Sequence, residues 1–196
     1  GRERVERVVV AKVDENRRPI PGTEMTFDCD TILLSVGLIP ENELTRGAGI
    51  TMDPRTNGAV VYENMETSLP GVFACGNVVH VHDLVDFVTQ ESQRAGAAAA
   101  RHVLEGAADA EGAISVETGG AVGYTVPQKI RVGNLPGKTC DLFFRVRRIF
   151  GDSVIRVTAE NGEVIAQYPR EHMAPGEMEH IMLPKVRLEK AGGKIT

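Results

Sequence analysis

The sequence predicts an α/β part followed by a small all-β, sandwich-like domain. Short apolar runs at 31–36 and 72–75 end at glycine or proline, as buried strands of parallel sheets do, and a long helical pattern follows the second run. After a short, small-residue stretch the hydrophobic period changes to two. Residues 1–110 are acidic, whereas the remainder is slightly basic. These observations place an α/β part at 1–110, a linker at 111–121 and an antiparallel β domain at 122–196.

The composition is that of an ordinary folded protein. Of 196 residues, 42% are hydrophobic and 25% charged, which argues against wholesale disorder. The net charge of -5 makes nucleic acid an unexpected partner. No apolar run approaches the roughly 20 residues of a membrane span, and the first residues lack a signal-peptide pattern, so we expect a cytoplasmic protein. Cys29, Cys75 and Cys140 form no C-x-x-C pair, so redox chemistry would require a cofactor.

The first elements are short strands. Valine-rich residues 7–14 and residues 23–27 flank a Pro/Gly-rich turn and therefore predict a hairpin. Residues 31–36 form a continuous apolar run, which predicts a central strand buried on both faces. The pair Asn57-Gly58 predicts a small hairpin before 59–62.

A second buried strand is expected at 72–75, followed by a loop at 76–82 and a helix over 84–104. Small and apolar residues recur in this helix at spacings of three and four: Val85, Val88, Ser92, Ala95, Ala99 and Val103. The small residues from Gly96 onward predict a close contact of this face, so a bulky side chain at Gly96 is expected to overpack it.

The last 75 residues predict five or six short antiparallel strands and no helix. Leu142 and Phe144 alternate with more polar neighbours and are expected to point inward, as are Ile155 and Val157. The pair Asn161-Gly162 predicts the tight turn of a hairpin.

Two segments carry the functional signal. Residues 27–42 contain Asp30-Thr31-Ile32-Leu33-Leu34-Ser35-Val36-Gly37-Leu38-Ile39-Pro40-Glu41-Asn42, and residues 67–78 begin Thr67-Ser68-Leu69-Pro70-Gly71-Val72-Phe73-Ala74-Cys75-Gly76-Asn77. Their motifs, order and spacing resemble the pyridine nucleotide-disulfide oxidoreductase family, the two-dinucleotide-domain flavoproteins. The resemblance covers residues 1–105. It implies that the α/β part is a fragment of such a flavoprotein.

The resemblance implies FAD as cofactor and NAD(P)H as cosubstrate, and it assigns five binding positions. Gly37 would close the nicotinamide-nucleotide domain, and Gly76 would let the backbone approach the flavin. Asn77 stands where the family has Asp, and its amide can still accept a hydrogen bond from the ribityl chain. The backbone N–H groups of Phe87 and Val88 would face the flavin pyrimidine ring. No catalytic residue is indicated.

The family's glycine fingerprint G-x-G-x-x-G does not occur in this chain. We therefore expect the carboxy-terminal part of a larger FAD-dependent oxidoreductase that passes hydride between NAD(P)H and a second acceptor. The fragment alone is expected to be inactive, and its first partner would be the missing amino-terminal part. A further redox subunit and a homo-oligomer are left open. The alternative function is a β-sandwich binding or assembly module with no catalysis of its own.

The sequence His80-Val81-His82-Asp83, with Asp86 nearby, is open to three interpretations. Two imidazoles and a carboxylate resemble part of a metal set, but a fourth ligand is not evident, so we expect no metal site. The histidines could instead face the flavin or substrate as proton donors. The simplest interpretation is solvated polar residues, with Asp83 as the helix N-cap.

Two further features receive structural interpretations. Cys75 lies within an apolar run and is expected to be a buried small hydrophobic residue. Arg145, Arg147 and Arg148 form a basic stripe, which is typical of a solvated strand face. The alternative is a docking surface for the acidic part of the chain.

Overall fold

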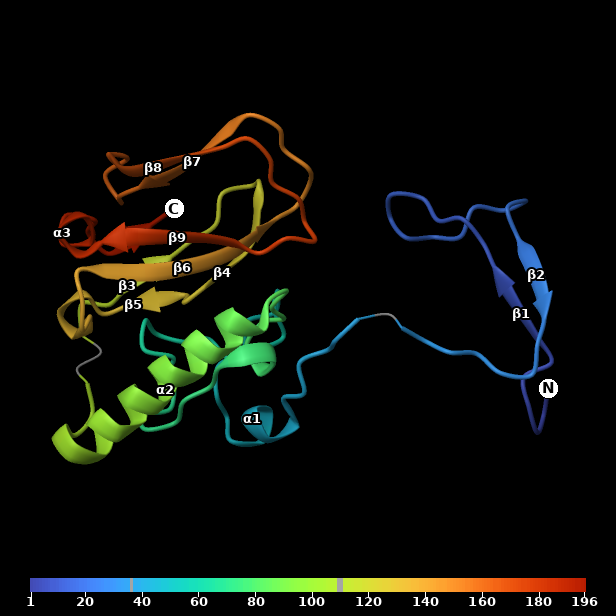
Figure 1. The fold of residues 1–196 in the computed structure, drawn as a ribbon, viewed down its shortest axis with the longest axis horizontal. Helices are drawn as coiled ribbons and strands as arrows, with labels where there is room; N and C mark the ends of the chain where they lie inside the picture. The colour runs from blue at the N-terminus through green and yellow to red at the C-terminus, as the bar shows by residue number, and fades with distance from the viewer. Residues whose placement is uncertain (36, 109–110) are drawn as a thin grey trace. The chain divides into compact units, whose positions relative to one another are not determined.

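The computed structural model describes residues 1–35, 37–108 and 111–196, and it divides into two compact units, Gly1–Gly37 and Leu38–Thr196 (Figure 1). The first unit holds β1 (Arg7–Val10) and β2 (Met25–Asp28). The second unit holds α1 (Glu43–Gly47), η1 (Gly76–Val78), α2 (Val85–Glu105), β3 (Ile114–Val116), β4 (Val122–Val126), β5 (Lys129–Ile130), η2 (Val132–Asn134), β6 (Thr139–Val146), β7 (Ser153–Thr158), β8 (Val164–Arg170), β9 (Glu179–Pro184), α3 (Lys185–Leu188) and β10 (Lys194–Ile195). Among the described helices, none has the length and apolarity that crossing a membrane requires.

The first unit is built on the predicted hairpin. Strands β1 and β2 pair antiparallel, from Arg7 opposite Asp28 to Val10 opposite Met25, which confirms the prediction. The prediction of a central strand at 31–36 is wrong for residues 31–35, which form no strand and are exposed, Leu33 to 92%. Val36 lies outside the described residues. An apolar run becomes a central strand only when strands flank it, and no described strand pairs with residues 31–35.

The predicted strand at 72–75 is also absent. Phe73 forms a single β-bridge with Glu66, and the rest of the segment has no regular secondary structure. Cys75 is only partly buried. The small hairpin predicted at Asn57-Gly58 is reduced to one bridge, between Met52 and Ala59, closed by the Asp53 N–H donating to the Gly58 carbonyl at 2.8 Å.

Helix α2 begins and ends within one residue of the predicted bounds. Its buried face differs from the prediction, however, because Glu91, Ala95 and Ala98 are the buried residues. Val85 and Val103, predicted on the buried face, are 74% and 82% exposed. Gly96 is exposed as well, and a Cβ placed there would meet no atom within 4 Å. The predicted close contact at Gly96 is therefore wrong.

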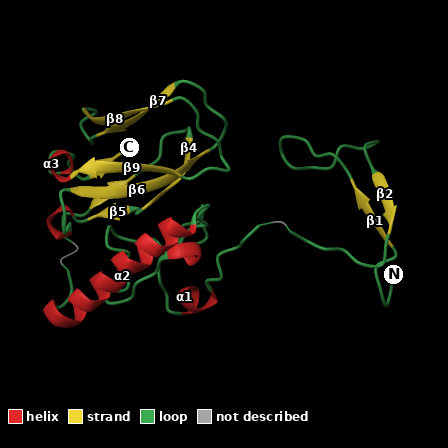
Figure 2. Ribbon diagram, viewed as in Figure 1, coloured by secondary structure: helices red, strands yellow, loops and turns green. Residues whose placement is uncertain are grey.

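The strand-rich part, from β3 to β10, forms three small sheets, with orders β10-β3-β5, β4-β6-β9 and β7-β8. Figure 2 shows α2 lying along one side of these strands. The hairpin of β7 and β8 turns at Asn161-Gly162 as predicted, with Gly162 at a φ of 85°. Two details differ from the expectations. The expected linker 111–121 holds β3, and the one-turn helix α3 follows β9 in a stretch predicted to contain no helix.

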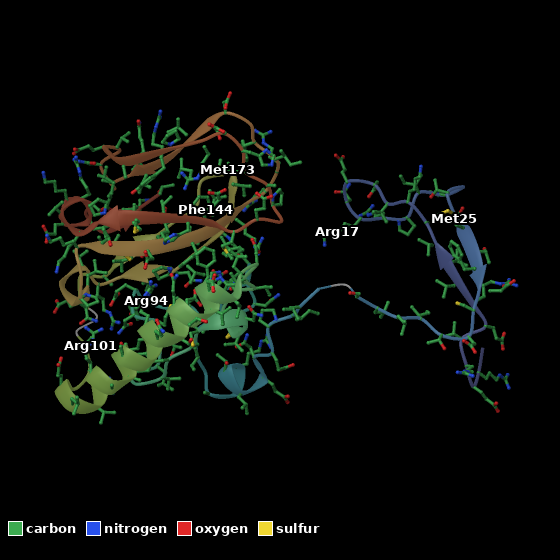
Figure 3. The ribbon with its side chains drawn as sticks, in the orientation of Figure 1. Arg17, Met25, Arg94, Arg101, Phe144 and Met173 are labelled. Atoms are coloured by element: carbon green, nitrogen blue, oxygen red, sulfur yellow. The ribbon has the colours of Figure 1, made fainter. Side chains whose placement is uncertain are left out.

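The main core lies among these strands. Figure 3 labels two of its members, Phe144 and Met173. Leu142, Phe144 and Val157 are buried and Ile155 packs against them, which confirms the inward positions. Phe143 is buried too, so both faces of β6 are covered. The division into a domain at 1–110 and a sandwich at 122–196 stays a prediction, because both stretches contribute residues to the second unit.

Candidate functional site

Four of the five predicted cofactor-binding residues lie around the start of α2. Gly37 belongs to the first unit, where its φ of 101° suits glycine. Gly76, Asn77, Phe87 and Val88 belong to the second unit, in η1 and in the first turns of α2. Their role toward a flavin stays a prediction.

Gly76 forms a tight turn against α2. Its φ is 71°, and a Cβ at this position would lie 3.2 Å from Cγ1 of Val88. The Gly76 N–H donates to Oε2 of Glu91 at 2.8 Å. Asn77 is exposed, and its Oδ1 accepts the backbone N–H of His82 at 3.2 Å. This turn therefore presents one amide side chain to solvent on a backbone that α2 holds in place.

The N-terminus of α2 carries no side-chain cap. Leu84 occupies the N-cap position and makes no capping hydrogen bond. The prediction that Asp83 caps the helix is wrong, because its carboxylate pairs with Arg145. The Phe87 N–H donates to the Leu84 carbonyl at 3.2 Å, so it is already engaged within the first turn. An uncapped helix start presents positively polarised N–H groups and favours an electron-rich partner.

His80 and His82 are buried, so their interpretation as solvated residues is wrong. Oε1 of Glu91 lies 2.7 Å from Nε2 of His80 and 3.1 Å from Nε2 of His82, and all three side chains are 1% exposed. Asp86, the carboxylate considered from the sequence, is exposed. Sequence reasoning missed Glu91. A signal was present, because Glu91 lies three residues after Val88 and four before Ala95 on the buried face.

Burial and hydrogen bonding act in opposite directions on this cluster. Burial raises the pKa of Glu91, but the hydrogen bond from His80 and the close approach of His82 outweigh it and lower the pKa to about 2. Burial lowers the pKa of His80 despite the neighbouring carboxylate. Burial and the charge of Glu91 raise the pKa of Cys75. The cluster therefore combines an ionised carboxylate with a neutral His80 imidazole, and Cys75 stays a thiol.

Aromatic rings from the strands enclose the two histidines. Phe143 on β6 lies with its ring centroid 6.0 Å from that of His80 and 5.7 Å from that of His82. Tyr124 lies 5.8 Å from His80, and Phe87 lies 6.1 Å from His82. The cluster is a polar centre inside an apolar shell, formed by the segment before α2 and by the strand-rich part together.

One residue of the basic stripe, Arg145, holds the segment before α2 to the strands. Its guanidinium donates to the Val81 carbonyl at 3.0 Å and forms an ion pair with Asp83. The interpretation as a solvated face is therefore wrong for Arg145, whereas Arg147 and Arg148 are exposed. A second link is the ion pair of Arg94, which Figure 3 labels on α2, with Asp141 on β6.

A buried ionic network holds the segment before Thr67 to the strand-rich part. Arg131, 4% exposed, donates to Glu66 at 2.8 Å, to Asn64 at 2.7 Å and to Glu63 at 3.2 Å. Burial raises the pKa of Glu66, but the Gly71 N–H and Arg131 outweigh it, and the pKa lies below its usual range. The network holds the start of the Thr67–Asn77 motif through the bond from the Gly71 N–H to Glu66. Its charged groups are buried, so its role is structural.

Comparison with known proteins identifies the family. The model of the family described as "Pyridine nucleotide-disulphide oxidoreductase" matches residues 3–118. The chain is 31% identical over 78 residues to the NADH glutamate synthase of Schizosaccharomyces pombe, covering 39% of this chain and 4% of that protein. It is 37% identical over 59 residues to the mitochondrial dihydrolipoyl dehydrogenase of Caenorhabditis elegans, covering 30% of this chain and 12% of that protein. The match thus spans a small part of either relative, and no solved structure matches significantly. Because the family model matches more than half of the length of this chain, the chain belongs to the pyridine nucleotide-disulphide oxidoreductase family.

Proposed function

We propose that this chain is the carboxy-terminal part of an FAD-dependent oxidoreductase that passes hydride between NAD(P)H and a second acceptor. The observation that carries the proposal is the uncapped N-terminus of α2, which begins at Val85, a short segment after the Gly76-Asn77 turn, in a member of this family. A helix start of this kind favours an anionic or electron-rich ring.

The residues present fit one side of a flavin. The exposed Asn77 offers an amide to the ribityl chain, on a turn that the positive φ of the buried Gly76 permits. FAD, when bound, supplies the hydride-transfer chemistry, and these residues bind and orient it. This chain lacks G-x-G-x-x-G, and we propose that an amino-terminal part of the same enzyme supplies the cradle for the pyrophosphate.

The test uses the complete gene product. We expect it to contain FAD and to oxidise NADH or NADPH with ferricyanide as acceptor. Asn77→Asp is expected to keep the flavin, whereas Asn77→Leu removes a hydrogen-bond acceptor and weakens FAD binding about tenfold. Gln93→Leu, an exposed change elsewhere on α2, serves as the control. A complete protein that holds no flavin and oxidises neither nucleotide would overturn the proposal.

A second function is proposed for the strand-rich part, as a binding module. The observation in its favour is a cavity of about 330 Å³ lined mainly by apolar side chains, among them Leu142, Phe144 and Val157. Such a cavity suits a small apolar ligand. Val157→Trp would fill part of the cavity and is expected to reduce binding of the fluorescent apolar probe ANS, whereas Leu104→Trp on the exposed side of α2 is not. Equal probe binding by both variants would argue against a binding module.

A further inference from the structure

We propose that His80, His82 and Glu91 bind a divalent transition-metal ion, with Zn²⁺ as the best fit. The proposal is independent of flavin binding. The three side chains offer ligand atoms that all lie within 4.8 Å of one another, and all three residues are buried. They come from two elements, the segment before α2 and α2 itself.

The protein's own hydrogen bonds leave this cluster incomplete. Of the four ring nitrogens, only Nε2 of His80 has a hydrogen-bond partner, the Glu91 carboxylate. Nε2 of His82 lies 3.1 Å from the same oxygen but without hydrogen-bond geometry, and both Nδ1 atoms are buried without a partner. Buried polar atoms are normally paired, so the unpaired Nε2 of His82 beside the Glu91 carboxylate points to a ligand.

The arrangement needs little change to hold an ion. A tetrahedral Zn²⁺ with bonds of about 2.1 Å separates its ligand atoms by about 3.4 Å. The Glu91 oxygen already lies 2.7 and 3.1 Å from the two Nε2 atoms, so the carboxylate has to retreat by less than about 1 Å. The second carboxylate oxygen stays on the Gly76 N–H, which orients the ligand as outer hydrogen bonds do in metal sites.

The chemistry of the donors selects the ion. Two imidazoles and one carboxylate suit Zn²⁺ and related transition metals, whereas Mg²⁺ and Ca²⁺ prefer oxygen ligands. Phe143, Tyr124 and Phe87 surround the ligands with aromatic side chains.

A pocket beside His80 would admit the ion, and the bound ion would have a structural role. His80 lines a pocket of about 260 Å³ together with Tyr124 and Arg145, which gives an ion a route inward. A bound ion would fasten the Gly76–His82 segment to the second turn of α2. Its expected role is structural, because it joins a segment without regular strand or α-helix to α2, the longest helix among the described residues.

The experiment measures Zn²⁺ binding by the whole chain after treatment with a chelator. We expect one Zn²⁺ per chain and, at a hundredfold excess over Kd, a rise in the unfolding temperature of about 5 °C or more. Mg²⁺ is expected to have no such effect. Replacement by Co²⁺ should give the visible absorption bands of a four-coordinate site, with water as the fourth ligand beside His80, His82 and Glu91.

Two variants and one control decide the assignment. His82→Phe keeps an aromatic ring beside Phe87 and Phe143 but removes both nitrogens, and it should weaken Zn²⁺ binding at least tenfold. Glu91→Gln keeps an acceptor for Gly76 and should have a similar effect, which covers the case in which His82→Phe does not fold. His172→Phe removes an exposed imidazole outside the cluster and should bind Zn²⁺ normally. The proposal is overturned if the unmodified chain takes up no Zn²⁺, or if the folded cluster variants bind it as the unmodified chain does.

Discussion

The ionic network around Arg131 provides the sharpest test of what holds the second unit together. Arg131→Leu would leave the carboxylates of Glu63 and Glu66, 0% and 4% exposed, without their guanidinium. Breaking a buried ion pair by removing one partner costs about 3–5 kcal/mol, because the remaining charge is buried without compensation. We therefore expect the free energy of unfolding, measured by urea denaturation with circular dichroism at neutral pH, to fall by about 3–5 kcal/mol.

The pH dependence of this loss adds an independent check. The pKa of Glu66 in the folded protein lies below its usual value, so its contribution is present above the unfolded pKa and is lost as the pH falls through the folded pKa. In Arg131→Leu the carboxylate loses its cation and protonates more readily, so the difference from the unmodified chain should shrink at about pH 4. Arg156→Leu, an exposed change on β7, should cost less than about 0.5 kcal/mol. Equal losses for the two variants, or a loss for Arg131→Leu that does not shrink in acid, would refute the reasoning.

Three further outcomes are expected. Phe144→Ala, at a 3% exposed core position, should lower the free energy of unfolding by about 3–5 kcal/mol in the same urea assay; a loss below about 1 kcal/mol would mean that the core closes around the gap. Gly96→Leu should leave the unfolding temperature unchanged or raise it, because the position is open and leucine favours a helix; a clear drop would show that this face of α2 is covered in solution. Purified residues 1–196 should be colourless and hold no stoichiometric FAD, because loss of the pyrophosphate cradle removes more than about 4 kcal/mol of binding; a yellow preparation with one flavin per chain, seen by absorbance, would contradict this.

Local signals in the sequence were sufficient for the elements that depend on them. The Asn161-Gly162 turn and the hairpin of β1 and β2 need only turn residues and flanking strands, and α2 needs only helix-forming residues over a long stretch. The apolar run at 31–36 contains no local signal of this kind. Its strand requires neighbouring strands on both edges, and residues 31–35 have none among the described parts of this chain.

The candidate site was predictable in position but only in part in composition. The Gly76-Asn77 turn and the helix behind it follow from the motif and the helical pattern. The pairing of His80 with Glu91 does not follow from these signals. It depends on the path of the chain after η1, which brings His80 against α2. The aromatic shell from β6 depends on contacts between residues more than fifty positions apart, which a single sequence does not encode by spacing.

The three-stranded sheet β10-β3-β5 bears on the order in which the chain folds during synthesis. Strand β3 at Ile114–Val116 pairs parallel with β10 at Lys194–Ile195, so nearly eighty residues separate the two partners. The hairpin of β7 and β8 can form as soon as residue 170 leaves the ribosome, whereas this sheet has to wait until residue 195 has been made. Until then the core cluster that contains Ile114, 3% exposed in the finished fold, lacks Ile195. A nascent chain halted before β10 would therefore leave part of this core open to chaperones and to aggregation.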